Sequence, residues 1–209
     1  GKPIFSEPPE SLEQHIARYR SRRRVINDEE RVARYLKYIG YYRFSGYCRS
    51  YQESGDPGHT FLKGTTFQNI LDLYIFDRKL RLHVMDALER MEVEIRTVIS
   101  DHMSLKYGSQ WYVDYQHFQR PKKNFNHLQF INIVKKETGY SGNGGGPDFC
   151  RRYFGKYCEP LLPPSWMVAE VLPIGAWSRI YSNLTKTEDR KAISNAFNVR
   201  YGAFGSWIY

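Results

Sequence analysis

Arg96 and His102 are residues whose types and spacing could carry acid–base chemistry on a phosphodiester. A histidine titrates near neutral pH and can accept the proton of a ribose 2′-hydroxyl, and an arginine can stabilise charge that develops on the phosphate. These two groups are the minimum set for a metal-independent ribonuclease. The R-x5-H pattern is weak evidence alone, because a chain with 19 arginines and 6 histidines will often contain one by chance. On a straight helix of about 100° per residue, the two side chains would also point about 120° apart.

Other ionisable residues fall on the apolar side of the same predicted helix. Asp77, Arg81, Glu92 and His102 lie inside the apolar sector, and Arg96 lies at its edge. Their i,i+4 spacing pairs Asp77 with Arg81 and Glu92 with Arg96, and burying such charges is costly unless they are paired. Two interpretations remain open. The pairs form a polar network, buried in the chain or at a subunit interface, that fixes helix register, or they line a polar pocket in which Glu92, Arg96 and His102 are catalytic.

Basic residues are concentrated near the start of the chain. The chain has 31 Lys+Arg and 22 Asp+Glu, a net charge of +9, and residues 1–52 hold 11 basic and 6 acidic residues, a net charge of +5. Arginine can fork onto phosphate and stack on bases, so an anionic partner such as RNA is expected, although a solvated helix face is an equal alternative. The predicted RNA-binding residues are Arg18, Arg20, Arg22, Arg23, Arg24 and Arg43.

Aromatic residues surround Arg43 in the segment 41–47. They could stack on bases, but packing into the core around Gly40 and Gly46 is favoured. Arg43 itself could contact phosphate or cap a helix end.

Several classes of protein and site are excluded by composition and spacing. Neither the histidines nor Cys48, Cys150 and Cys158 have the spacing of a zinc site, and the glycine-rich segment 141–147 lacks the Gly-Lys-Ser/Thr of a phosphate loop. We therefore expect no metal, no cofactor and a mobile surface loop at 141–147. An odd cysteine count, no secretory leader and no apolar run of about 18 residues predict a cytoplasmic protein outside the membrane.

The elements that must position these residues are predicted to be helices. Ser11 and Gln14 form a capping-box pattern that opens a helix to about Arg22, and Asn27 or Asp28 caps a second helix. Residues 66–106 contain no proline or glycine and predict one long central helix, whose apolar residues, Leu80, Val84 and Leu88 among them, face a core. Further helices are expected near 124–137, 148–157, 174–184 and 187–197, with Trp166 and Trp177 in the core. The chain is thus predicted to be all-α and a single domain over 1–209, with basic N-terminal helices in 1–52 and C-terminal helices in 124–209.

Four segments in this order resemble the Abi-like proteins of bacterial abortive phage infection, the AbiD/AbiF group. They are residues 38–47, residues 74–81 continuing to 89–96, residues 104–112, and residues 164–170 continuing to 177–184. The resemblance implies a HEPN-like helical bundle, since the family is grouped with HEPN domains, many of which are ribonucleases that dimerise. It also implies a phage-defence or toxin–antitoxin protein that acts on RNA without a metal. The partners it implies are RNA, including a small structured RNA, and a second copy of the chain in a homodimer.

One family feature does not occur in this sequence. The usual catalytic signature, an Arg-Asn-x-x-x-His segment, lies beyond the region that matches residues 189–194, and the chain ends at Tyr209. We therefore expect a chain truncated at its carboxy-terminus, or a short form without that active site. The expected function is RNA binding and, in the complete chain, RNA cleavage that leaves a 2′,3′-cyclic phosphate. The alternatives are a non-catalytic module that binds RNA or a protein, and a purely structural dimerisation bundle with negligible RNA binding.

Overall fold

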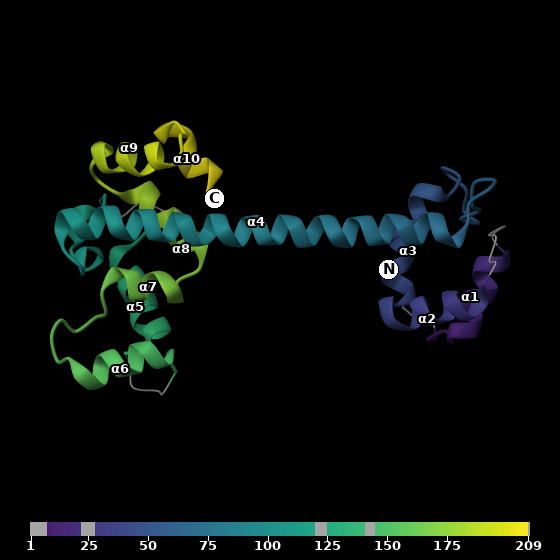
Figure 1. The fold of residues 1–209 in the computed structure, drawn as a ribbon, viewed down its shortest axis with the longest axis horizontal. Helices are drawn as coiled ribbons and strands as arrows, with labels where there is room; N and C mark the ends of the chain where they lie inside the picture. The colour runs from purple at the N-terminus through teal and green to yellow at the C-terminus, as the bar shows by residue number, and fades with distance from the viewer. Residues whose placement is uncertain (1–7, 22–27, 120–124, 141–144, 209) are drawn as a thin grey trace, which may run out of the picture. The chain divides into compact units, whose positions relative to one another are not determined.

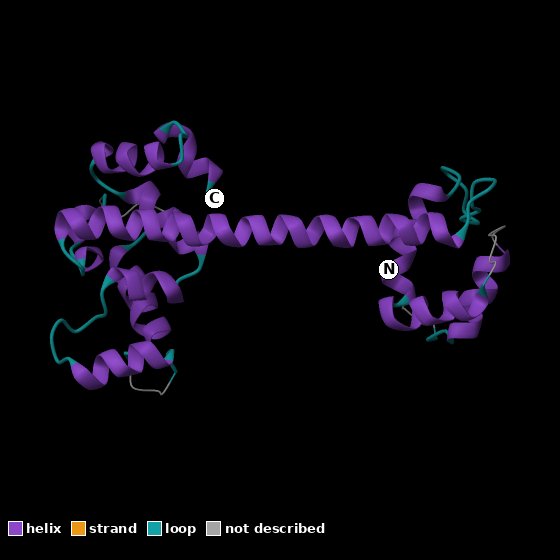
Figure 2. Cartoon of the chain, viewed as in Figure 1, coloured by secondary structure: helices purple, strands orange, loops and turns teal. Residues whose placement is uncertain are grey.

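The computed structural model describes residues 8–21, 28–119, 125–140 and 145–208, and all regular secondary structure in these ranges is helical (Figures 1 and 2). These ranges also contain isolated bridges, among them Gln52–Phe61 and Phe118–Leu184. The predicted all-α fold class with a long central helix is confirmed. The chain divides into two compact units, Gly1–Asp86 (unit 1) and Ala87–Tyr209 (unit 2), and helix α4 contributes residues to both.

In the described residues of unit 1, three helices and a 3-10 turn precede α4. They are α1 (Leu12–Ser21), α2 (Glu29–Ile39), α3 (Tyr41–Cys48) and η1 (Arg49–Tyr51). The predicted capping box is formed: Gln14 N donates to Ser11 Oγ, and Ser11 N donates to Gln14 Oε1. Asp28 caps α2 by accepting from Arg31 N. The buried core of this unit is made by Tyr19, Val32, Leu36, Phe44, Cys48, Phe61, Phe67, Ile70 and Leu71.

Helix α4 spans Phe67–Tyr107, close to the predicted 66–106, and Gly108 ends it with a positive φ of 93°. Such a backbone conformation is easy only for glycine. The expectation that the whole apolar stripe faces a core was wrong for Leu80, Val84 and Leu88, which are exposed. They lie in the middle of α4, whereas core residues come from its two ends, which pack in the cores of units 1 and 2.

The described part of unit 2 contains the carboxy-terminal part of α4 and six further α-helices. They are α5 (His127–Thr138), α6 (Asp148–Lys156), α7 (Ser165–Val171), α8 (Ile174–Asn183), α9 (Thr187–Ala196) and α10 (Tyr201–Trp207), with 3-10 turns η2 (Trp111–Val113) and η3 (Tyr115–His117). The four predicted helices correspond to α5, α6, α8 and α9. Residues 141–144 of the predicted glycine-rich loop lie outside the described residues. Figure 1 shows α9 and α10 on one side of this part of α4, and α5, α6 and α7 on the other.

The core of unit 2 confirms one tryptophan prediction and corrects another. Trp177 is buried among Ile99, Phe204 and other apolar side chains of the same cluster. Trp166 is 52% exposed, because α7 buries the face formed by Ser165, Val168 and Ala169. Residue 166 lies off that face, since positions i, i+3 and i+4 share one side of a helix.

Candidate functional site

A buried carboxylate in unit 2 gathers three polar side chains from the end of α4. Asp189, in the first turn of α9, is only 2% exposed. Its Oδ1 lies 2.9 Å from His102 Nε2 and 2.6 Å from Lys106 Nζ, and Tyr107 Oη donates to its Oδ2 at 2.7 Å. These four residues are referred to below as the Asp189 cluster.

Helix geometry explains how the Asp189 cluster forms. His102 and Lys106 are four residues apart, so they lie one above the other on the same face of α4, and Tyr107 follows directly. Asp189 lies in the first turn of its own helix, where the helix dipole favours a negative charge. The cluster therefore ties the start of α9 to the last turns of α4.

Asp189 and Lys106 shift each other's pKa. Burial opposes ionisation of Asp189, but hydrogen bonds from Lys106, His102 and Tyr107 outweigh it and lower the pKa of its carboxyl. Hydrogen bonding to Asp189 in turn raises the pKa of Lys106. Asp189 is therefore held as a carboxylate and Lys106 as an ammonium at neutral pH.

This arrangement can support acid–base chemistry. A carboxylate that accepts from Nε2 of a histidine fixes the tautomer and leaves Nδ1 as the basic nitrogen. Lys106 binds the same carboxylate, and 38% of its side chain is exposed. A phosphate could therefore approach the Lys106 ammonium. His117 packs against the ring of Tyr107 with centroids 4.3 Å apart, and burial lowers its pKa.

The second predicted catalytic residue, Arg96, has different partners. Arg96 forms the predicted ion pair with Glu92, and its Nη1 donates to the carbonyl of Ala169 in α7 at 3.3 Å. Burial lowers the pKa of Arg96, an effect that nearby Glu170 opposes. Arg96 thus contacts α7, whereas His102 contacts α9, and the structure does not gather the two around one partner.

The other predicted ion pair, Asp77 with Arg81, lies in unit 1. Arg81 Nη2 is 3.2 Å from Asp77 Oδ2, which also accepts from Tyr47 Oη at 2.5 Å. The side chains of Arg81 and Asp77 are 45% and 35% exposed, so the single chain does not bury this pair, and a place at a subunit interface stays a prediction. The Asp77 and Glu92 pairs belong to different units.

Unit 1 has a basic cavity on the helices that were predicted to bind RNA. The cavity has a volume of about 220 Å³ and is lined by Arg18, Tyr41, Ser45, Arg49, Gln52 and His59. We refer to it as the Arg18–Arg49 cavity. Arg18 also pairs with Glu10, and the ring of Tyr41 stacks on His15 with centroids 3.9 Å apart. Arg49 follows α3 directly and is exposed.

The remaining predicted RNA-binding residues are distributed as follows. Arg20 pairs with Glu29, and Arg43 is exposed on α3. Arg22, Arg23 and Arg24 lie outside the described residues. In the aromatic segment around Arg43, Phe44 is buried as core packing predicts, while Tyr42 is exposed.

We did not predict three residues of these candidate sites from the sequence, namely Asp189, Lys106 and Arg49. The i,i+4 spacing of His102 and Lys106 was a usable signal, but nothing in the sequence indicates that α9 returns to the end of α4 and buries Asp189 there. Within the described ranges, no group of three or more His, Cys, Asp or Glu side chains is placed to hold a metal ion. The same ranges contain no helix that is both long and apolar enough to cross a membrane.

Comparison with known proteins gives one match. Residues 34–209 match the model of a family described as Abi-like protein. No curated protein and no solved structure matches the chain.

Proposed function

We propose that this chain, which belongs to the Abi-like protein family, is an abortive-infection protein that binds RNA through unit 1. The Arg18–Arg49 cavity is the observation that carries the proposal. Two arginines and Tyr41, one face of whose ring stacks on His15, line one hollow. Single-stranded RNA is recognised by this combination of phosphate-binding cations and ring surfaces.

The position of Arg49 makes it the most informative residue of this cavity. Arg18 already has a carboxylate neighbour in Glu10, whereas no ion pair to Arg49 is found in the described part of the chain. A cation of this kind can bind a phosphate without first giving up a carboxylate partner. An RNA target also implies that the protein acts in the cytoplasm.

The test is a salt titration of RNA binding by fluorescence anisotropy. Arg49→Gln should weaken binding to a labelled single-stranded RNA and reduce the slope of log K against log salt by about 0.7 for each phosphate that Arg49 neutralises. Arg34→Gln, which removes an exposed arginine of α2 outside the cavity, is the matched control. Equal slopes for wild type and Arg49→Gln would remove the cavity from the RNA interface.

RNA cleavage is a second candidate function, and the contact between His102 and Asp189 favours it. In this scheme Nδ1 of His102 takes the proton of a ribose 2′-hydroxyl, and the 2′-oxygen forms a bond to phosphorus. The bond from phosphorus to the 5′-oxygen breaks, and that oxygen takes a proton from water. The hydroxide that remains takes the proton from His102 and restores its neutral form. Lys106 neutralises charge on the phosphate, and the products are a 2′,3′-cyclic phosphate and a 5′-hydroxyl.

Cleavage is tested separately from binding, with EDTA present. Wild type should release 2′,3′-cyclic phosphate ends, and His102→Gln should abolish them while RNA binding persists. His83→Gln, an exposed histidine of α4, is the matched control. If wild type binds RNA and produces no such ends, the chain is a non-catalytic RNA-binding module.

A further inference from the structure

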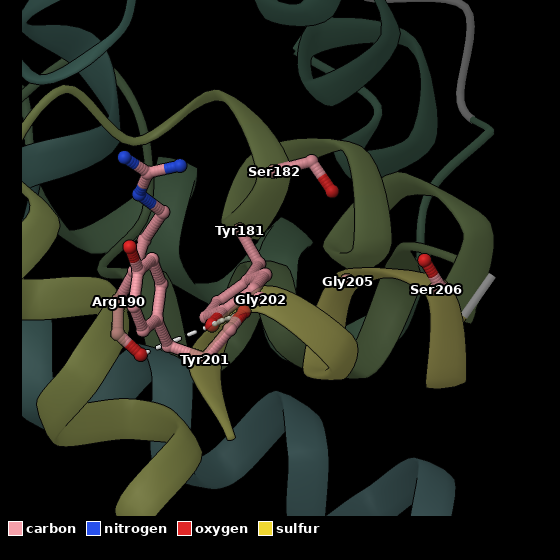
Figure 3. A pocket seen from close by; sticks show the side chains of 7 residues that line it. All are labelled: Tyr181, Ser182, Arg190, Tyr201, Gly202, Gly205 and Ser206. Carbon is pink, nitrogen blue, oxygen red and sulfur yellow. Dashed lines mark hydrogen bonds between the residues drawn. The ribbon is translucent and has the colours of Figure 1, made fainter. Parts of the chain in front are cut away.

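A second cavity lies in unit 2 between α8, α9 and α10. Its volume is about 440 Å³, within the range of small-molecule sites. Figure 3 shows Arg190 and Tyr201 on one side of it and Ser182 and Ser206 on the other. Its other lining residues are Tyr181, Gly202 and Gly205. We refer to it as the Arg190 cavity.

Arg190 brings a positive charge with unused hydrogen-bonding capacity to this cavity. Its Nη2 donates to Thr187 Oγ1 at 3.1 Å, and no hydrogen bond from its Nη1 is found in the described ranges, whereas its Nε is buried and does not face the cavity. No ion pair to Arg190 is found in the described ranges. A guanidinium whose donors are not occupied by a carboxylate suits an anionic group, and its fork matches a phosphate.

The wall and floor of the cavity are held in place by the protein. Tyr181 Oη donates to the carbonyls of Arg190 at 3.0 Å and Tyr201 at 3.3 Å, and so links α8 to the other two helices (Figure 3). A Cβ on Gly205 would lie 3.3 Å from Ser182 Oγ, which shows that α10 packs closely on α8. The site is therefore preorganised, which reduces the entropy cost of binding.

The remaining lining groups indicate the rest of the ligand. Tyr201 is 43% exposed, and Lys191 Nζ lies 5.4 Å from the centroid of its ring, so the ring can stack on a planar base on the face opposite Lys191. The hydroxyls of Ser182 and Ser206 can bond to polar edges. A guanidinium for a phosphate and a ring face for a base suit a phosphate joined to a base. We infer that the Arg190 cavity binds a free nucleoside monophosphate. The inference does not depend on RNA binding by unit 1, because all its lining residues belong to unit 2.

Isothermal titration calorimetry on the full chain tests this, with AMP, adenosine and inorganic phosphate as probes. AMP should bind saturably with a Kd below about 1 mM, and adenosine and phosphate should each bind at least about tenfold more weakly, because each lacks one half of the contacts. Arg190→Gln should weaken AMP binding by at least about tenfold, the size expected for a charged hydrogen bond. Arg152→Gln, an exposed arginine of α6, should leave it unchanged.

A second variant separates loss of the site from loss of the fold. A Cβ on Gly202 meets no heavy atom within 4 Å, so Gly202→Leu adds volume at the cavity without a backbone clash. It should abolish AMP binding while tryptophan fluorescence of the folded chain stays unchanged. The inference is overturned if AMP does not bind, if phosphate binds as tightly as AMP, or if AMP binds equally well to both variants and wild type.

Discussion

Replacing Asp189 by asparagine tests the role of the Asp189 cluster directly. The substitution keeps the size of the side chain and removes the charge that faces His102, Lys106 and Tyr107. An asparagine accepts only at its oxygen, and its amide nitrogen only donates. The hydrogen bond with Tyr107 must therefore reverse, so that the tyrosine hydroxyl accepts, and the bonds from His102 and Lys106 to the remaining oxygen lose their charge assistance.

The size of the effect follows from burial. A hydrogen bond to a charged group contributes about 1.5–3 kcal/mol, and removing one partner of a fully buried pair costs about 3–5 kcal/mol. Lys106 and His102 are partly exposed and can turn toward water, which reduces the loss. We expect Asp189→Asn to lower the free energy of unfolding of unit 2 by about 2–4 kcal/mol.

The assay is urea unfolding at pH 7 followed by tryptophan fluorescence. All four tryptophans, at positions 111, 166, 177 and 207, lie in unit 2, so the signal reports on that unit. Glu188→Gln is the matched control, because Glu188 also pairs with Lys106, at 3.1 Å, but is exposed. An exposed pair is worth about 0–1 kcal/mol, so this control should change little.

The same variant has a defined pH dependence. The pKa of Asp189 is lowered in the folded protein, so its ionised form stabilises the fold above the unfolded pKa of about 4. This stability is lost as the pH falls through the folded pKa, and the gap between wild type and Asp189→Asn should close below about pH 4. A variant within about 0.5 kcal/mol of wild type at pH 7, or a gap independent of pH, would refute the reasoning.

Three further substitutions test packing and pairing, each by urea unfolding. Gly146→Ala should destabilise by about 1–3 kcal/mol, because its Cβ would lie 2.4 Å from the carbonyl oxygen of Thr138, whereas Gly155→Ala in open space should not. Tyr112→Phe should cost about 1–2 kcal/mol by removing a buried hydroxyl that donates to Pro163 O at 2.6 Å; no loss would contradict this. Glu92→Gln should lower the free energy of unfolding by about 1–2 kcal/mol. This is less than the loss expected for a fully buried pair, because Arg96 is 19% exposed. Replacing the exposed Glu94 by glutamine is the control.

Local features of this protein were predictable because their causes are local. Capping acts within a few residues along the chain, as in the pair Ser11 and Gln14 and in the Asp28 cap. The long helix follows from the absence of glycine and proline over 66–106, because each residue there favours the helix locally. The i,i+4 ion pairs formed for the same reason, since helix periodicity alone brings Glu92 beside Arg96. The four matching segments likewise indicated the family that residues 34–209 belong to.

The partners of His102 were decided by tertiary structure. Helical spacing placed Arg96 and His102 on one helix, but the packing of α7 and α9 on different faces of α4 gave each its own neighbour, Ala169 for one and Asp189 for the other. Asp189 is 87 residues from His102 along the chain, and no periodicity relates residues so far apart.

Tertiary structure also decided which apolar side chains of α4 are buried. A helical wheel marks the apolar side of α4 but not which part of that side other elements cover, so Leu88 was expected in a core and is exposed. The two cavities also exist only after folding, because each joins residues from separate helices, as Arg190 and Ser206 do. Composition and spacing determined the helices, the charge and the family, and the long-range packing of helices determined which charged groups meet.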